Sequence, residues 1–177
     1  MRDEHSKSPG NRTLGLLMVF AMWLVLLGVL AMLFGQYLEH QEHPNRHAAG
    51  QVTESGAREI TLERNRAGHY LAEGRINGLP VTFMLDTGAS DISIPGELAE
   101  RLDLAQGRPV TYRTANGLIT GFATRLERVS VGPIEMRDVR GSINPNMDGE
   151  QILLGMSFLG GLEFSQRDGR LTLRLPP

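Results

Sequence analysis

The chain has 177 residues, a formal net charge of -2 and no cysteine. These values allow one modest globular domain plus an additional segment, and they exclude disulfides and thiolate metal sites. Basic residues are scattered along the sequence without forming the basic patch that nucleic-acid binding requires, so no nucleic-acid partner is expected.

The first long apolar segment, residues 14–38, contains no charged residue. About 20 apolar residues in a helix cross the hydrocarbon core of a bilayer, so this segment is predicted to be a transmembrane helix. A cleavable signal peptide is the alternative, but its apolar region is usually only about 7–15 residues long.

The charges that flank this segment predict its orientation. Arg2, Lys7 and Arg12 precede it, whereas Glu39 and Glu42 follow it. By the positive-inside rule, the tail of residues 1–13 is expected in the cytoplasm. The chain is therefore predicted to be a single-pass membrane protein whose remaining residues lie in the periplasm or another extracytoplasmic space.

Residues 39–57 are polar, contain glycine and proline, and lack apolar periodicity, which predicts a flexible linker. Within it His40, His43 and His47 could share one helical face and bind a metal. Pro44 interrupts that helix, so a solvated linker without a metal site is the favoured interpretation.

From Arg58 onward, short alternating or apolar runs are separated by turn residues, which predicts an all-β domain over residues 58–177. The segments "REITLERN", "HYLAEGRI" and "LPVTFMLD" are predicted to form a meander, with a two-residue turn at Asn77-Gly78. A short surface helix is expected at residues 95–104. Later strands are expected within residues 110–132, 136–145 and 170–175, and residues 151–159 are expected to be buried.

Several catalytic arrangements are excluded by residues that this domain lacks. It contains one histidine, His69, and no cysteine, and the sequence around Ser157 does not have the Gly-x-Ser-x-Gly spacing. It also lacks the ligands of a zinc hydrolase and the glycine-rich loops that bind nucleotides. Carboxylate chemistry without a metal or cofactor remains.

The stretch "VTFMLDTGASDISIP" places Asp86 at the end of an apolar strand. Gly88 permits a tight turn and close approach of another backbone, and the following "DISIP" is expected to resume as a strand. A carboxylate in this position is well placed for chemistry. Asp and Gly are also favoured in ordinary turns, so the triplet alone leaves both interpretations open.

Two further segments accompany this triplet: a glycine-tipped hairpin at residues 114–118 and the sequence "ILLG" at residues 152–155. Together they resemble the retropepsin-like aspartic proteases, and more closely the bacterial members that carry one N-terminal membrane helix. The resemblance covers Arg58 to Leu175. It implies an all-β, retropepsin-like closed β-barrel with one short helix, preceded by the transmembrane helix.

The resemblance also implies roles for individual residues. Asp86 is expected to be the catalytic aspartate, Thr87 to hydrogen-bond across a dimer, and Gly88 to contact substrate or the catalytic water. Residues 114–118 are expected to form a flap, and residues 152–155 a second arm behind the active-site turn. The residues expected to bind substrate are Ala89, Ser90, Asp91, Ala115, Asn116 and Gly117.

The sequence departs from the retroviral pattern at Met156-Ser157, where retroviral members have Arg-Asn or Arg-Asp. The structural ion pair of that arginine is therefore not expected here. Hydrolysis by this family needs two carboxylates that share a proton, and this chain offers one Asp-Thr-Gly triplet. The expected enzyme is thus a membrane-anchored homodimeric endopeptidase that acts on peptides or proteins. The alternative is a non-catalytic, membrane-tethered β-barrel used for binding or assembly.

Overall fold

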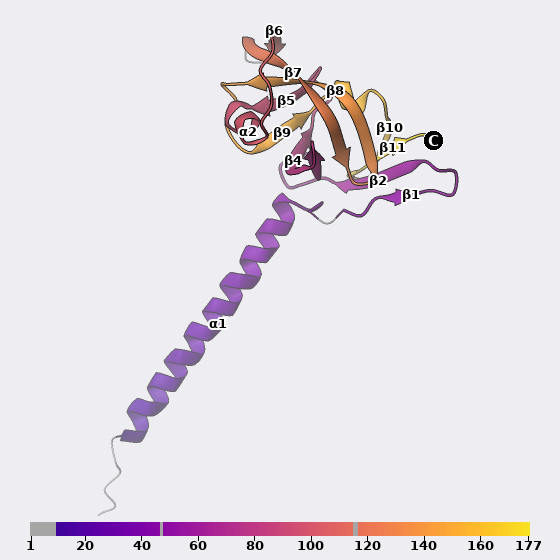
Figure 1. The fold of residues 1–177 in the computed structure, drawn as a ribbon. Coiled ribbons are helices and arrows are strands. Elements are labelled where there is room, and N and C mark those ends of the chain that lie inside the picture. The colour runs from indigo at the N-terminus through magenta and orange to yellow at the C-terminus, as the bar shows by residue number, and fades with distance from the viewer. Residues whose placement is uncertain (1–9, 47, 115–116) are drawn as a thin grey trace, which may run out of the picture. The chain divides into compact units, whose positions relative to one another are not determined.

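The computed structural model describes residues 10–46, 48–114 and 117–177. Contacts divide the chain into two compact units, Met1–Gln41 and Glu42–Pro177 (Figure 1). Of the predicted tail, residues 1–9 lie outside the described residues. His47, one of the three histidines considered as metal ligands, and the side chain of His40 lie outside them as well.

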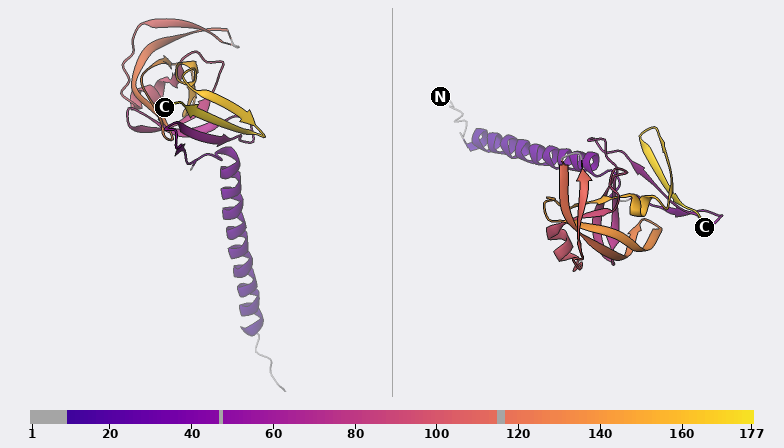
Figure 2. Two further views of the ribbon diagram at one scale, coloured as in Figure 1. Left: turned by 90° about the vertical axis from the view of Figure 1, so that its right-hand side faces the viewer. Right: turned by 90° about the horizontal axis from the view of Figure 1, so that it is seen from above.

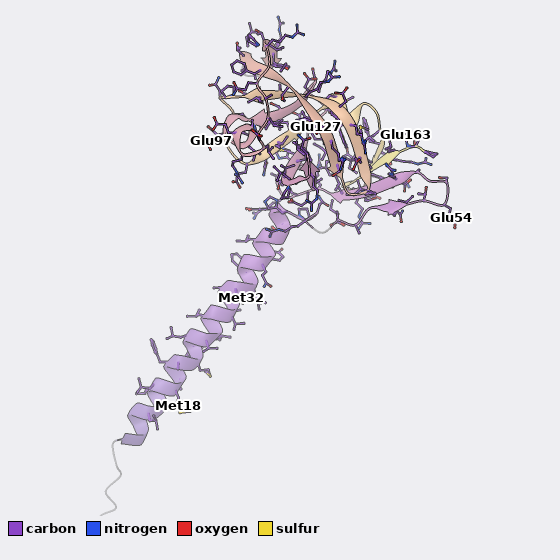
Figure 3. All side chains as sticks on the ribbon, viewed as in Figure 1. Met18, Met32, Glu54, Glu97, Glu127 and Glu163 are labelled. Carbon is purple, nitrogen blue, oxygen red and sulfur yellow. The ribbon has the colours of Figure 1, made fainter. Side chains whose placement is uncertain are left out.

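The N-terminal unit consists of helix α1, Gly10–Glu42. Its apolar stretch Leu14–Leu38 is long enough to cross a membrane, and none of that stretch is buried by the rest of the protein. Apolar side chains project from all sides of the helix, including Met18 and Met32 (Figure 3). A helix that is apolar all round needs an apolar environment. By length and composition it fits a membrane span or a signal sequence.

Seven strands of the second unit form one sheet, in the order β3-β4-β9-β5-β8-β7-β6. Because β3 also pairs with β7, six of these strands close into a barrel and β6 lies outside the closed ring. The predicted closed β-barrel is therefore confirmed. The strands are β3 Leu71–Ile76, β4 Leu79–Leu85, β5 Ile92–Pro95, β6 Pro109–Thr114, β7 Gly117–Val131, β8 Ile134–Asn144 and β9 Gln151–Leu154.

The barrel interior is filled by aliphatic and aromatic side chains, which suit strands because they pack well on a pleated surface. Two short helices add to this core: α2, Gly96–Arg101, buries Leu98 and Ala99, and α3, Met156–Leu159, buries Phe158 and Leu159. The helix predicted at residues 95–104 is thus confirmed. The largest fully buried side chains are Leu62, Ile76, Phe83, Ile92, Ile94, Leu126, Ile134, Ile143, Ile152, Leu154, Phe158 and Leu159.

A second sheet has four strands in the order β1-β2-β11-β10: β1 Gln51–Val52, β2 Arg58–Glu63, β11 Arg170–Leu175 and β10 Glu163–Arg167. Figure 2 shows the yellow C-terminal hairpin of β10 and β11 alongside the purple β2. The predicted meander is therefore wrong in one respect, because β2 pairs with β11 and not with β3. Strand β10 was not predicted.

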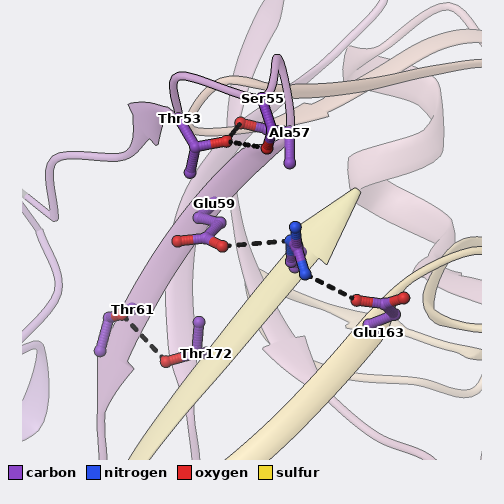
Figure 4. Close-up of polar contacts among 8 residues, drawn as sticks. Thr53, Ser55, Ala57, Glu59, Thr61, Glu163 and Thr172 are labelled. Carbon is purple, nitrogen blue, oxygen red and sulfur yellow. Dashed lines mark hydrogen bonds and ion pairs between the residues drawn. The ribbon is translucent and has the colours of Figure 1, made fainter. Parts of the chain in front are cut away.

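Matched patterns on β2 and β11 explain this pairing. Ile60 lies opposite Leu173 and Leu62 opposite Leu171, and all four are buried. On the other face, the Arg174 guanidinium lies 3.2 Å from Glu59 of β2 and 3.3 Å from Glu163 of β10 (Figure 4). Complementary cross-strand pairs of this kind specify partner and register, and β3 already has β4 and β7 as neighbours.

The connecting turns follow local sequence signals. Asn77 and Gly78 have φ values of 49° and 89°, so both central residues of the β3–β4 hairpin adopt the positive φ that a type I′ turn requires. Gly132 has φ 55° in the turn between β7 and β8. The predicted turn at Asn77-Gly78 is confirmed.

The segment predicted as a flexible linker, residues 39–57, differs from that prediction. Helix α1 continues to Glu42, and β1 pairs with β2. Between them Asn45 is only 4% exposed. A polar composition predicted a solvated segment, but the Asn45 side chain is buried because backbone groups of the domain satisfy its hydrogen bonds.

Candidate active site

Asp86 follows directly after β4, at the end of a parallel pairing with β9 in which Leu85 lies opposite Leu154. The backbone N–H of Asp86 donates to the Leu154 carbonyl at 3.1 Å, which extends the ladder by one residue. The apolar strand therefore carries Asp86 to the rim of the barrel, where this residue is half-buried.

The turn after Asp86 is held by the aspartate itself. The Gly88 N–H donates to Asp86 Oδ1 at 2.8 Å, and the Ala89 N–H donates to the Asp86 carbonyl at 3.2 Å. A Cβ on Gly88 would lie 3.1 Å from Asp86 Oδ1, a distance tighter than most real contacts. Within the described residues, Asp86 Oδ2 has no hydrogen-bond partner, so this oxygen is available to a water or a second carboxyl group.

The residues that follow β9 brace this loop from behind. Met156 N–H donates to the Ala89 carbonyl at 2.8 Å, and Ser157 N–H donates to the Ser90 carbonyl at 2.9 Å. A Cβ on Gly155 would lie 2.2 Å from the Asp91 carbonyl oxygen. The structure thus places residues 152–155 behind the turn that follows Asp86, as predicted, and only glycine fits at position 155, the point of closest approach.

Ser157 takes part in the same bracing. Its hydroxyl donates to the Arg140 carbonyl of β8 at 2.8 Å and accepts the N–H of Ile92 at 3.2 Å. Arg140 in turn places its Nε 3.6 Å from Asp91 Oδ1. Met156-Ser157 lacks the arginine of the retroviral pattern, and here an arginine of β8 faces the loop carboxylate.

A cavity of about 650 Å³ opens in front of this loop. Of the predicted site residues, the structure brings together Asp86, Gly88, Ala89, Ser90 and Asp91 in its wall, whereas Thr87 and Gly117 do not line it. Ala115 and Asn116 lie outside the described residues. The rest of the wall is formed by Ser93, Tyr112, Arg113, Ile119, Gly121, Ser142, Asn144, Asn146, Met147 and Leu153.

Tyr112 connects strand β6 to the loop after β4, across the wall of the cavity. Its hydroxyl donates to Asp91 Oδ2 at 3.2 Å, while Arg140 faces the other oxygen of the same carboxylate, whose side chain is 18% exposed. Burial raises the pKa of the Tyr112 hydroxyl; its hydrogen bond with Ser142 lowers that pKa, and the negative charge of Asp91 raises it further. The hydroxyl therefore stays protonated and able to donate at neutral pH.

Sequence reasoning missed Tyr112, Ser142 and Arg140. The available signal was the strand predicted from Val110 onward, which leads into the hairpin of residues 114–118 and made an aromatic residue there a candidate to face the cavity. The alternation of apolar and polar residues does not by itself show which face of β6, a strand outside the closed barrel, lies toward the core. The link between Tyr112 and Asp91 crosses 21 positions, so it depends on tertiary structure.

The sequence profile described as gag-polyprotein putative aspartyl protease matches residues 72–161, which include Asp86, strands β6 and β7, and residues 152–155. The chain belongs to the retropepsin-like aspartic proteases. Its domain is similar to the crystal structure of a retropepsin-like aspartic protease from Rickettsia conorii, with 34% identity and a TM-score of 0.57. The match covers 67% of this chain and 92% of that one.

Two curated relatives of this retropepsin-like chain are named as uncharacterized proteins. The first, from the cobV 5′ region of Sinorhizobium sp., is 32% identical over 166 residues and covers 87% of this chain and 71% of the relative. The second, RP867 of Rickettsia prowazekii (strain Madrid E), is 33% identical over 151 residues and covers 78% of this chain and 62% of the relative.

Gly155→Ala should destabilise the retropepsin-like domain. Its new methyl group meets backbone atoms, which cannot rotate away, so we expect a loss of about 3 kcal/mol or more in the free energy of unfolding. Urea unfolding followed by near-UV circular dichroism measures it. Gly35→Ala is the control, since no atom lies within 4 Å of that Cβ. Equal stability of the two variants would contradict the tight packing behind the loop.

Tyr112→Phe should change how stability depends on alkaline pH. Folding raises the pKa of this hydroxyl, so its contribution is complete below the unfolded value of about 10 and is lost as pH rises through the folded value. Wild-type protein should therefore lose stability more steeply than the variant above about pH 10. Thermal unfolding midpoints across this range measure the difference, and parallel curves for the two proteins would contradict it.

Proposed function

We propose that this protein is a membrane-anchored aspartic endopeptidase, active as a homodimer with one Asp86 from each chain. The observation that carries the proposal is the Asp86 carboxylate itself. It lies in the wall of a cavity of about 650 Å³, with Oδ1 held by Gly88 and, within the described residues, no partner on Oδ2.

The chemistry requires two such carboxyl groups. Placed about 3 Å apart, they share one proton because both cannot be ionised at once. The ionised group takes a proton from a water, and the water oxygen attacks the carbonyl carbon of the peptide bond. The protonated group gives its proton to the carbonyl oxygen as charge develops there. The C–N bond then breaks as the first group passes the water proton to the leaving nitrogen and the second group takes back a hydroxyl proton, which leaves one shared proton on the pair. This route needs no metal and no cofactor.

A second copy of the chain supplies the missing group most simply. The chain has one Asp-Thr-Gly triplet, and a two-fold axis next to Asp86 would bring both copies together with identical surroundings. Thr87 supports this assembly because it is exposed and does not line the cavity of its own chain. We assign its hydroxyl to a hydrogen bond with the partner chain.

The cavity wall suits an extended peptide. Ile119, Met147 and Leu153 offer apolar surface, while Ser90, Ser93 and other polar side chains offer hydrogen-bonding groups. The flap strand β6 and the start of β7 border the same cavity through Tyr112 and Ile119. We propose that Ala89, Ser90, Asp91 and the hairpin of Ala115, Asn116 and Gly117 contact the substrate on both sides.

The membrane assignment rests on helix α1. The Sinorhizobium relative matches 87% of this chain, more than residues 42–177 make up, so its likeness includes part of the helical unit. With Arg2, Lys7 and Arg12 on the N-terminal side, we propose a cytoplasmic N-terminus and a periplasmic or otherwise extracytoplasmic protease domain. Anchoring in one bilayer would also raise the effective concentration of the two chains.

Asp86→Asn should abolish peptide hydrolysis and leave the fold intact, because the amide conserves volume but cannot serve as the base. The assay incubates the full chain in detergent with a mixed peptide library, with and without an aspartic-protease inhibitor such as pepstatin, and identifies the products by mass spectrometry. Asp168→Asn is the matched control, since it lies in the β10–β11 turn at φ 50°, which asparagine also tolerates.

Two outcomes of that assay would overturn the proposal. Undiminished turnover by purified Asp86→Asn protein would exclude Asp86 as the catalytic group. A folded wild-type dimer that cuts no peptide of the library would instead favour the non-catalytic assembly module.

Thr87→Val should weaken the homodimer. The variant leaves the hydrogen-bond partner of the hydroxyl unpaired, at a cost of about 1–3 kcal/mol, which corresponds to a rise in the dimer dissociation constant of roughly 5- to 150-fold. Analytical ultracentrifugation in detergent measures it. Thr61→Val is the control, since this exposed threonine bonds to Thr172 in its own sheet. Equal dissociation constants for the two variants would exclude Thr87 from the interface.

A further inference from the structure

Asn45 attaches the segment after helix α1 to the catalytic domain. Its side-chain Nδ2 donates to the carbonyl oxygens of Glu63 and Leu71, both at 2.8 Å, and its Oδ1 accepts the Glu63 N–H at 2.6 Å. Both polar groups of the amide are thus satisfied while the residue is 4% exposed. An amide buried in this way holds firmly, because release would leave the buried Leu71 carbonyl without its partner.

The two residues that Asn45 joins belong to the frame of the catalytic site. Glu63 ends β2, and Leu71 begins β3, where it pairs with Met84, two residues before Asp86. The neighbouring segment is folded as well, since the Ala48 N–H donates to the Asn45 carbonyl at 3.0 Å. Residues around Asn45 therefore belong to the domain and not to a free tether.

The short connection between the apolar stretch and Asn45 limits how far the domain can lie from the end of that stretch. The apolar stretch ends at Leu38, and seven further residues lead to Asn45. Even fully extended they span about 25 Å, whereas a free tether from Leu38 to Arg58 would span about 70 Å. Because α1 continues to Glu42, part of the shorter connection is helical and rises only about 1.5 Å per residue.

We propose that Asn45 is a clamp that confines the catalytic domain to the membrane surface, so that its substrates are polar peptide segments lying directly next to a membrane span. This inference rests on the proposed function, because it assumes a membrane anchor and a peptidase. It adds the class of substrate and the residue that selects it.

A second cavity gives such a substrate a path. It measures about 500 Å³ and lies beside the clamp, lined by His43 and Arg46 on one side and by Glu73, Thr82, Met84 and residues 147–151 on the other. Met147 also lines the cavity of Asp86. A peptide that leaves the active site past Met147 therefore enters the second cavity, whose lining contains both basic and acidic side chains. Polar residues that flank a membrane span would fit that lining.

The test uses the full chain reconstituted into liposomes together with single-span reporter proteins. Each reporter carries one cleavable segment, chosen from the peptide library, at increasing distance from its span, and the same segment is added as a soluble peptide. Wild-type protein should cut the near reporter about 10-fold faster than the far one, because the clamp raises the effective concentration only near the membrane.

A pair of insertions identifies the clamp. Six Gly/Ser residues placed between Gln41 and Glu42 lie before Asn45, and the same six placed between Ala48 and Ala49 lie after Asn45 but before β1, next to the exposed Ala49. If Asn45 holds, only the first insertion moves cleavage toward the far reporter. Asn45→Ala should raise the ratio of far to near cleavage, normalised to turnover of the soluble peptide.

The outcomes separate the two proposals. If wild-type protein leaves the soluble peptide intact, the proposed peptidase function fails. If the soluble peptide is cut but near and far reporters are cut equally, or if both insertions shift cleavage to the same extent, the clamp fails while the peptidase stands. The insertions keep the test decisive even if Asn45→Ala does not fold.

Discussion

The position of the Asp86 carboxylate depends on backbone hydrogen bonds between its own loop and the residues around the end of β9. Leu154 accepts the Asp86 N–H, and Met156 and Ser157 donate to the carbonyls of Ala89 and Ser90. These bonds turn the six-residue loop 86–91, between β4 and β5, into part of the barrel wall. A half-buried carboxylate is costly to hold in place, and the Gly88 N–H, donating to Oδ1, offsets part of that cost.

The features that sequence predicted correctly are those set by neighbouring residues. The hairpin at Asn77-Gly78 follows from the positive φ that both positions adopt, and α2 follows from helix formers placed after Pro95. The strand before Asp86 follows from β-branched and aromatic residues bounded by turn signals. The motif order also predicted that residues 152–155 return behind the loop, since the family resemblance rested on that spacing.

The features that sequence could not predict are pairings between distant segments. Alternation identified β2 and β11 as strands, but their partnership depends on pairs that meet only in the folded sheet, such as Ile60 with Leu173 and Glu59 with Arg174. The link from Tyr112 to Asp91 needs the position of a strand outside the closed ring. Asn45 was hidden for a different reason: polar composition predicts solvation, yet a polar side chain is readily buried where backbone groups satisfy it.

In the proposed enzyme, the single Asp86 of each chain restricts where hydrolysis can occur, and the clamp at Asn45 adds a related restriction. One chain presents a single carboxylate, so hydrolysis depends on meeting a second copy, and anchoring confines that search to two dimensions. The clamp at Asn45 would confine the search for substrate to the same layer, because the domain cannot move farther from the bilayer than its short connection allows. Activity would then require enzyme, partner and substrate in one membrane, and the short connection between Leu38 and Asn45 would contribute to specificity together with the cavity lining.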